Sequence, residues 1–178
     1  VRESMGVCPQ KNTIYPNLSV IEHVRLVALF KGLSDEEIEK EAPEMVRFAG
    51  LEEKMHTKAK ALSGGMKRKL CLAMALVGGS KVIFLDEPTS GMDPQSRRGT
   101  WELLQNAKKG RLIVLTTHFM DEADLLGDRI AVMSAGKLNC VGSSLFLKQR
   151  YGVGYTLTLA KQPNFDELAE DTSALITR

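Results

Sequence analysis

The sequence predicts an α/β fold in which a mainly parallel sheet is flanked by helices. Short apolar segments alternate with stretches of helical periodicity, and those at 81–85 and 111–116 are far enough apart for a crossover helix. Parallel strands need such crossovers, whereas a tight turn can join antiparallel strands. A region at about 19–60 has helical patterns without strands, and we expect a small helical subdomain there.

The first segment of the chain, residues 4–10, is predicted to be a short strand that ends at Gln10. A helix should begin after Ser19, because Ser19 and Glu22 have the capping-box spacing, in which each side chain binds the other residue's backbone N–H. Apolar residues follow at helical spacing, which indicates a face packed against a core.

A second helix of this region is predicted to begin at Ser34, which repeats the capping-box spacing with Glu37. Pro43 lies inside the helical pattern and should kink or split the helix, because proline lacks a backbone N–H and clashes with the preceding turn. Gly50 suits the helix end. The segment 51–62 is polar and irregular.

The central part of the chain alternates between helices and strands. A helix is predicted at 63–77, and residues 81–85 form a continuous apolar run of the kind that is buried on both faces of a parallel sheet. A helix at 93–108 opens with aspartate and proline, which suit the N-cap and the first turn. Residues 111–116 are predicted to form a second buried strand.

Shorter elements are predicted in the last part of the chain. They are a helix at 120–126, a hairpin of strands at 129–134 and 137–141, a helix at 143–151 and a strand at 155–160. Residues 161–178 are polar and lack a clear core face. We therefore expect one domain over 1–160, followed by a linker or the start of a C-terminal extension.

The composition is that of an ordinary globular domain, with 43% hydrophobic and 26% charged residues. Lys and Arg number 24 against 22 Asp and Glu, and the net charge of +2 does not favour a nucleic-acid partner. The three cysteines have no metal-ligand spacing, so reduced thiols are expected. The longest apolar stretch, 70–77, is far shorter than the ~18 residues of a membrane span.

Ser63, Gly64 and Gly65 open the predicted helix at 63–77. A helix N-terminus offers unpaired N–H groups and the positive end of the helix dipole, and glycine lets the backbone approach a ligand closely. These residues therefore suit a phosphate group. A serine N-cap followed by a loose first turn explains the same residues without a ligand.

Polar residues follow two of the predicted strands. Asp86 can hold Mg²⁺, which prefers oxygen ligands, and Glu87 can polarise a water that attacks a γ-phosphate. His118 follows the next strand, at the sheet edge where ligands of α/β proteins bind. The alternatives are that the acids cap a turn and that the histidine is structural. No role is proposed for His23 or His56, which serve as comparisons.

Three further features have two readings each. Asp93 suits a helix cap, and Gln10 suits an ordinary loop position at a strand end. The basic run at 67–69 suits a solvated helix face, although it could also contact a phosphate or an anionic membrane surface.

Together and in this order, these residues resemble the ATP-binding-cassette (ABC) transporter family over about residues 4–160. The resemblance implies Gln10 as the Q-loop, 62–66 as the signature, 82–86 as Walker B, Glu87 as the catalytic base, 90–93 with Asp93 as the D-loop, and His118 as the switch histidine. The stretches 6–10, 91–94 and 136–155 are similar to the A subfamily of eukaryotic ABC transporters, many of which move lipids.

This resemblance implies a P-loop NTPase-like fold and an ATP hydrolase that powers transmembrane transport of lipids. It implies ATP and Mg²⁺ as cofactors, with Asp86 and Gln10 at the metal. ATP would lie between two cassettes, so that Ser63, Gly64 and Gly65 contact the partner's nucleotide. The implied partners are a second nucleotide-binding domain and transmembrane domains, which would place this domain at the cytoplasmic face of a membrane.

The family's G-x-x-x-x-G-K-[ST] phosphate loop does not occur in the sequence. In the family it precedes the Q-loop, and nine residues precede Gln10 here, so we expect a chain that is truncated before the Q-loop and lacks the phosphate-loop strand. The isolated chain should then hydrolyse ATP negligibly. The strand at 111–116 should also have an unpaired edge, which favours aggregation.

Two alternatives to a transport ATPase remain. The first is a soluble ABC ATPase without a transport role, against which the +2 charge and the A-subfamily-like stretch at 136–155 weigh. The second is a catalytically inert cassette that only completes a partner's ATP site, and the missing phosphate loop is compatible with it.

Overall fold

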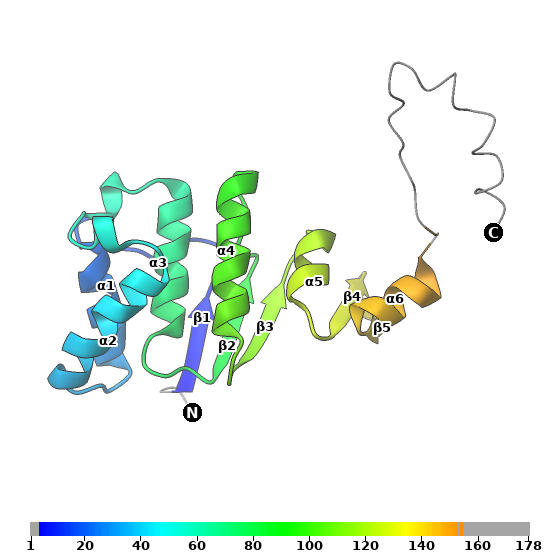
Figure 1. Cartoon of the computed structure of the whole chain (residues 1–178), viewed down its shortest axis with the longest axis horizontal. Coiled ribbons are helices and arrows are strands. Elements are labelled where there is room, and N and C mark those ends of the chain that lie inside the picture. Colours follow the sequence, from blue (N-terminus) through cyan, green and yellow to red (C-terminus); the bar gives the residue numbers. More distant parts are fainter. Residues whose placement is uncertain (1–3, 153, 155–178) are drawn as a thin grey trace, which may run out of the picture. The chain divides into compact units, whose positions relative to one another are not determined.

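The computed structural model describes residues 4–152 and 154 and divides into two compact units, 1–144 and 145–178. Figure 1 labels the helices and strands. They are β1 (Met5–Cys8), α1 (Val20–Phe30), α2 (Asp35–Phe48), α3 (Gly64–Leu76), β2 (Val82–Asp86), α4 (Pro94–Ala107), β3 (Leu112–Thr116), α5 (Met120–Leu126), β4 (Ile130–Ser134), β5 (Lys137–Gly142) and α6 (Ser144–Tyr151), with short 3-10 turns at Glu52–Lys54 and Ala59–Ala61. The predicted strand at 155–160 and the linker at 161–178 lie outside the described residues.

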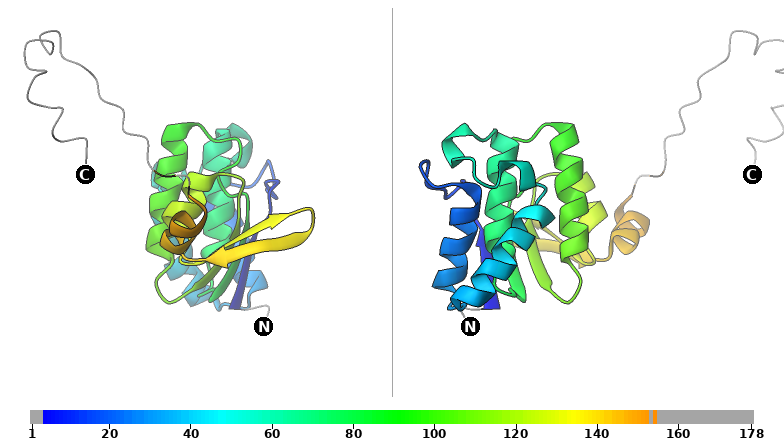
Figure 2. Two further views of the ribbon diagram at one scale, coloured as in Figure 1. Left: turned by 90° about the vertical axis from the view of Figure 1, so that its right-hand side faces the viewer. Right: turned by 60° about the vertical axis from the view of Figure 1, so that its left-hand side comes forward.

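The main sheet has three parallel strands in the order β1-β2-β3, which confirms the predicted α/β class. Helices α3 and α4 lie against one face of this sheet (Figures 1 and 2). Strands β4 and β5 form the predicted antiparallel hairpin, which Figure 2 shows projecting as a separate ribbon. Its turn is made by Ala135 and Gly136, both with left-handed backbone.

The hydrophobic core lies between the helices and the covered face of the sheet. Ile83 and Leu85 of β2 are 0% and 2% exposed and point into it. Helix α3 contributes buried side chains between Leu70 and Leu76 and packs against β1 and α1. Among the described residues, the largest fully buried apolar side chains are Leu51, Leu70, Leu72, Leu76, Ile83, Leu85, Val20, Val24, Val46 and Val77.

The prediction that β2 and β3 are buried on both faces is wrong for the described chain. Side chains on the uncovered face are exposed: Phe84 by 39%, Val7 by 59% and Val114 by 42%. These three residues are register partners and form one apolar row across the sheet. A continuous apolar run shows that both faces of a strand tolerate burial, whereas burial itself needs a second layer of structure.

We expect this apolar row to make the isolated chain associate, because contiguous exposed apolar surface favours contacts between molecules. Replacing both Phe84 and Val114 with threonine should weaken association by at least roughly tenfold, as measured by sedimentation velocity over a concentration series. Leu29→Thr removes a similarly exposed side chain (55%) from α1 and should change association little. An unchanged association constant in the double variant would contradict this expectation.

The helical subdomain begins as predicted, with both capping boxes formed. Ser19 accepts from the backbone N–H of Glu22 and its own N–H donates to the Glu22 carboxylate, and Ser34 and Glu37 repeat the arrangement. Pro43 lies inside α2, which continues to Phe48, so of the predicted kink or split the split does not occur. Across the described part of the chain, no helix combines the length and apolarity that crossing a bilayer requires.

Helices α1 and α2 hold the C-terminal end of α3. The Lys31 ammonium donates to the carbonyl oxygen of Val77 at 2.6 Å and to the Ser80 hydroxyl at 2.5 Å. The Glu41 carboxylate accepts from the backbone N–H of Gly78 at 2.6 Å. In the turn after α3, a backbone carbonyl oxygen and a backbone N–H are therefore each paired by a side chain of the helical subdomain.

The contact of Lys31 should make stability depend on pH in the alkaline range. Burial lowers the pKa of Lys31 from 10.5 to about 8, against the opposing effect of the Glu41 charge. As pH rises from about 8 to 10.5, the folded chain has lost this proton while the unfolded chain still binds it, so Lys31 contributes growing stability. The free energy of unfolding of wild type minus that of Lys31→Met, measured by urea unfolding, should increase across this pH range. A constant difference would contradict the assignment.

Candidate functional site

The carboxyl ends of the parallel strands bring together three of the predicted site residues. Gln10 follows β1, Glu87 follows β2 and His118 follows β3. The Gln10 amide N–H donates to Glu87 Oε2 at 2.9 Å, and His118 Nδ1 lies 3.3 Å from Glu87 Oε1. Each oxygen of the Glu87 carboxylate therefore has a partner from a neighbouring strand end.

These contacts favour the ionised form of Glu87. The hydrogen bond from Gln10 lowers the pKa of the Glu87 carboxyl most, and the hydrogen bond and charge of His118 add to it, with a smaller contribution from Ser90. Partial burial opposes them, since the side chain is 27% exposed. Glu87 is thus a carboxylate at neutral pH, in contact with solvent, and able to accept a proton from a water.

The backbone of Glu87 is left-handed, with φ of +45°. This conformation is costly for a residue with a side chain, and it persists where the surroundings fix it. Here the Glu87 N–H donates to the carbonyl oxygen of Thr116 at 3.0 Å, as the chain turns away from the sheet. The sharp turn carries the Glu87 side chain toward Gln10 and His118.

Asp86 is the last residue of β2 and its carboxylate accepts from the Thr116 hydroxyl. Asp86 and the amide oxygen of Gln10 offer oxygen ligands at the same sheet edge, which suits Mg²⁺. In the part of the chain that the structure describes, no group of three or more His, Cys, Asp or Glu side chains is placed to coordinate a metal ion. Two protein ligands fit Mg²⁺ nevertheless, because it keeps several waters and binds substrate phosphates.

Ser63 is the N-cap of α3, and its hydroxyl accepts from the backbone N–H of Met66 at 3.2 Å. Ser63 and Gly64 are exposed, and a side chain added at Gly64 would meet open space. The first turn of α3 thus presents backbone N–H groups to solvent, as a phosphate site requires. Among the described contacts, no hydrogen bond joins these residues to Gln10, Glu87 or His118.

Asp93 is the N-cap of α4, as its capping interpretation predicts. Its carboxylate accepts from the backbone N–H groups of Gln95 at 3.1 Å and Ser96 at 2.9 Å. The contacts with Ser96 chiefly lower the pKa of Asp93. The Asp93 side chain is exposed at the start of the helix.

Arg68 is a residue of this site that the sequence did not single out. It is 3% exposed, and its guanidinium donates to six oxygens of the loops that follow β1 and β2. The acceptors are the carbonyl oxygens of Pro9, Gln10, Asp86, Glu87 and Pro88 and the side chain of Asn12, at 2.5–3.5 Å. Arg68 therefore joins α3 to the backbone of the two segments that follow β1 and β2.

The interpretation of the basic run at 67–69 as a solvated face is wrong for Arg68. A signal was present in the helical spacing, because Arg68 lies three, four and seven residues before Cys71, Leu72 and Ala75, all of which are buried. Arg68 extends the buried stripe of α3 by one turn, at the level where loops replace apolar strands.

Glu122 is a second buried residue without a sequence prediction. It is 0% exposed, and its carboxylate accepts from the Thr89 hydroxyl at 2.8 Å and from the Trp101 indole N–H at 2.9 Å. Thr89 lies two residues after Glu87, and Glu122 belongs to α5, which starts shortly after His118. Glu122 thus connects the segments that carry these two side chains.

The family profile described as ABC transporter matches residues 1–90, the half of the chain that holds Gln10, the start of α3 and Glu87. The chain belongs to the ABC transporter family.

The curated ABC relatives support the A subfamily. The human phospholipid-transporting ATPase ABCA3 is 55% identical over 99% of this chain and 10% of its own length. ABC transporter A family member 2 of Dictyostelium discoideum is 55% identical over 90% and 10%, and human ATP-binding cassette sub-family A member 2 is 53% identical over 92% and 7%. The chain spans a tenth or less of the length of these relatives.

Solved ABC structures share the fold. CbiO1 from Clostridium perfringens, part of the ABC transporter complex cbiONQ, matches with a TM-score of 0.75 and 31% identity over 85% of this chain and 62% of that one. The ATP-binding cassette MJ0796, bound to ADP and Pi as a dimer, matches with a TM-score of 0.71 and 29% identity over 80% and 64%. The chain is therefore an ABC ATP-binding domain.

Proposed function

We propose that this chain is the ATP-hydrolysing domain of an ABC transporter and that hydrolysis powers transmembrane transport of phospholipids. The meeting of Gln10, Glu87 and His118 around one carboxylate carries the hydrolytic part of this proposal. The similarity to phospholipid-transporting relatives supports the lipid part. The domain would span 1–160, with the helical subdomain at about 19–60 and a linker after it.

The reaction assigns a role to each side chain. A water on the solvent side of Glu87 attacks the γ-phosphorus of ATP, and the bond from that phosphorus to the β–γ bridging oxygen breaks. The Glu87 carboxylate accepts the proton of the water. His118, whose Nδ1 contacts Glu87, can donate a hydrogen bond to the γ-phosphate. Together, His118 and Glu87 would orient the attacking water.

Asp86 and Gln10 would hold Mg²⁺, which would neutralise charge on the phosphates when bound. Gln10 would thus contact both Mg²⁺, through its amide oxygen, and Glu87, through its amide N–H. Ser63, Gly64 and Gly65 would bind the γ-phosphate of a nucleotide held mainly by a second nucleotide-binding domain. Asp93, at the exposed start of α4, would lie at that same interface.

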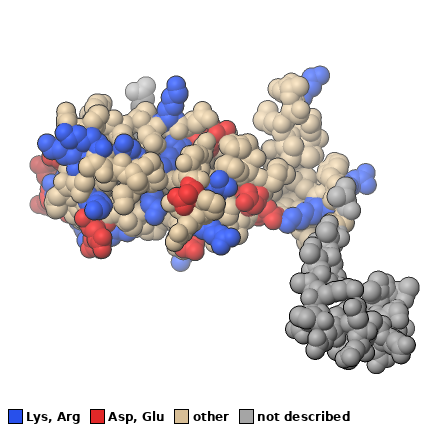
Figure 3. Space-filling model, turned by 90° about the horizontal axis from the view of Figure 1, so that it is seen from above, with Lys and Arg blue, Asp and Glu red and all other residues tan. Residues whose placement is uncertain are grey.

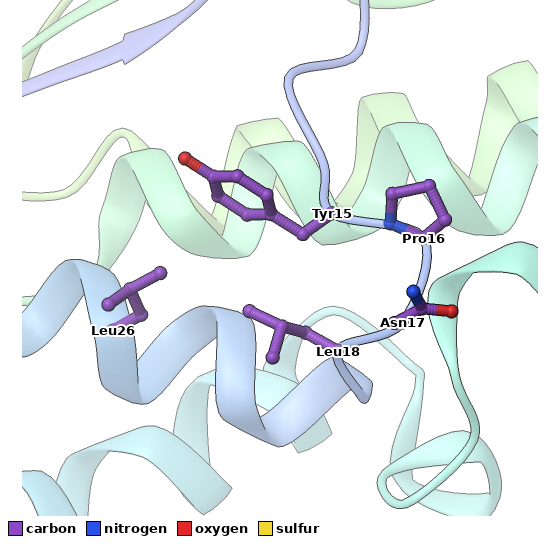
Figure 4. Close-up of a pocket in the computed structure, with 5 residues that line it drawn as sticks. All are labelled: Tyr15, Pro16, Asn17, Leu18 and Leu26. Atoms are coloured by element: carbon purple, nitrogen blue, oxygen red, sulfur yellow. The ribbon is translucent and has the colours of Figure 1, made fainter.

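A pocket beside the Q-loop supplies the docking site that we propose for the transmembrane domains. It has a volume of about 360 Å³ and is lined by Tyr15, Pro16, Asn17, Leu18 and Leu26 (Figure 4). Tyr15 is 62% exposed, although it lies against mostly apolar neighbours. An apolar side chain from a cytoplasmic loop of the membrane domain fits this pocket, which would place the chain at the cytoplasmic face of a membrane.

Hydrogen bonds join the chain segment that lines the pocket to the start of α1. The backbone N–H of Tyr15 donates to His23 Nε2 at 2.8 Å, and His23 Nδ1 lies 2.7 Å from the carbonyl oxygen of Ser19. The segment after Gln10 is therefore fixed to the start of α1. Basic and acidic side chains are interspersed on the face seen in Figure 3. The pocket itself is lined mainly by apolar side chains, which favours an apolar contact at this site.

Transport by the intact transporter that carries this domain tests the proposal. In vesicles with a fluorescent phospholipid, lipid translocation should require ATP and should fall with ATP turnover in Glu87→Gln. Leu26→Asp should reduce the lipid moved per ATP hydrolysed, whereas Leu29→Asp, on α1 outside the pocket, should retain that ratio. ATP turnover without any phospholipid movement would contradict the lipid part of the proposal.

The chain of 178 residues tested alone should hydrolyse ATP negligibly, because its sequence contains no G-x-x-x-x-G-K-[ST] phosphate loop. Phosphate release by the purified chain that disappears in Glu87→Gln would overturn this expectation. Loss of turnover in the chain together with full Glu87-dependent turnover in the transporter would exclude the inert-cassette alternative.

A further inference from the structure

We propose that Arg97 is a positioning residue for ATP hydrolysis, which holds His118 against Glu87 through the ring of Phe119. This inference rests on the proposed function, because it assumes that the contact between His118 and Glu87 is used in catalysis. Arg97 belongs to α4, and Phe119 follows the switch histidine directly. None of the sequence motifs assigns a role to either residue.

The rings and charges form one continuous stack. The Arg97 guanidinium carbon lies 3.8 Å from the centroid of the Phe119 ring. The Phe119 and His118 ring centroids are 4.1 Å apart with an interplanar angle of 39°. His118 Nδ1 in turn lies 3.3 Å from Glu87 Oε1. Four side chains thus connect the first turns of α4 to the catalytic carboxylate.

Arg97 is directed to the ring rather than to a polar partner. Its Nε is buried and has no hydrogen-bond partner within the described residues. A guanidinium placed flat on an aromatic face gains attraction from the ring quadrupole and from shared burial. Arg97 also follows the Asp93 cap by one helical turn, so the rigid start of α4 fixes where its side chain can reach.

His118 needs such a constraint, since its side chain is 56% exposed. Its polar contact is to Glu87, and on the other side it meets Phe119. Two contacts hold Phe119 in place. Its backbone N–H donates to the Thr117 hydroxyl at 3.0 Å, and the Arg97 guanidinium packs on its ring. Without the stack, the imidazole would sample rotamers that move Nδ1 away from Glu87.

Steady-state ATP hydrolysis by the intact transporter tests this role. Arg97→Met and Phe119→Leu should each lower kcat by roughly 10- to 100-fold, because a misplaced catalytic group costs that much. KM for ATP should change little, since neither side chain contacts the nucleotide in the proposed site. Phe119→Tyr keeps the ring and should retain most of the rate. Arg98→Met, the same change at the exposed neighbouring arginine, should leave hydrolysis at the wild-type level.

A double-mutant cycle separates positioning from general destabilisation. In a His118→Ala background, Arg97→Met should lower kcat no further, because the group that it positions is gone. Equal losses in both backgrounds, or wild-type kcat in Arg97→Met and Phe119→Leu, would overturn the inference. If His118→Ala alone left turnover unchanged, the proposed role of His118 in hydrolysis would fail instead. Should Arg97→Met not fold, the same cycle is run with Phe119→Leu.

Discussion

Replacing Glu87 with glutamine should lower ATP turnover of the transporter by about 10²- to 10⁴-fold, the range that a general base contributes. Glutamine keeps the shape of the side chain and can still pair with Gln10, whereas it cannot accept the proton of the attacking water. ATP binding should persist, because the change removes one negative charge near the phosphates. Phosphate release measured under saturating ATP, with equilibrium ATP binding in parallel, checks both expectations.

Glu102→Gln provides a matched control for this prediction. It makes the same chemical change at an exposed position of α4, away from the three strand ends. Its turnover should equal that of wild type. Wild-type turnover in Glu87→Gln, or equal losses in both variants, would remove Glu87 from its catalytic role.

The largest loss of stability should come from Arg68→Met. Methionine fills part of the same volume but leaves five backbone carbonyl oxygens without their buried donor. Hydrogen bonds from charged groups are worth about 1.5–3 kcal/mol each and are not additive, so we expect a loss of about 3–5 kcal/mol in the free energy of unfolding. Urea unfolding at low protein concentration, followed by the fluorescence of Trp101, the chain's one tryptophan, measures it.

Two variants bracket this expectation. Arg68→Lys keeps the charge and some of the donors and should lose roughly half as much, since an ammonium lacks the flat fork of a guanidinium. Arg47→Met makes the full change at an exposed position of α2 and should cost less than about 1 kcal/mol. Similar values for Arg47→Met and Arg68→Met would show that the contacts of Arg68 carry no stability.

Much of the candidate site was predictable from local rules. Adjacent parallel strands end at one sheet edge, so Glu87 and His118 were expected there, whereas Gln10 was assigned to the site only through the family resemblance. The structure brings all three together. The capping boxes at Ser19 and Ser34 follow from a spacing of three residues, because the first helical turn fixes that distance. Such patterns depend on neighbours in sequence or on strand direction alone.

Features that depend on the rest of the fold were not predictable in this way. Arg68 lies between two lysines, and nothing in that run shows that loops from two strands converge on its tip. Phe84 has the hydrophobicity of a core residue, and its exposure depends on which layers cover the sheet. Pro43 is tolerated because the carbonyl that it leaves unpaired belongs to Glu39, an exposed residue that water can hydrate.

The left-handed backbone of Glu87 sets stability against activity at a single position. Glycine adopts that conformation without strain, so Glu87→Gly should relax the turn even as it removes the catalytic carboxylate. Selection for a well-folded domain would then favour losing the acid, and selection for hydrolysis alone would retain it. A cassette released from the need to hydrolyse ATP would reach an inert form through one substitution, in which relief of the backbone strain offsets the lost contacts with Gln10 and His118.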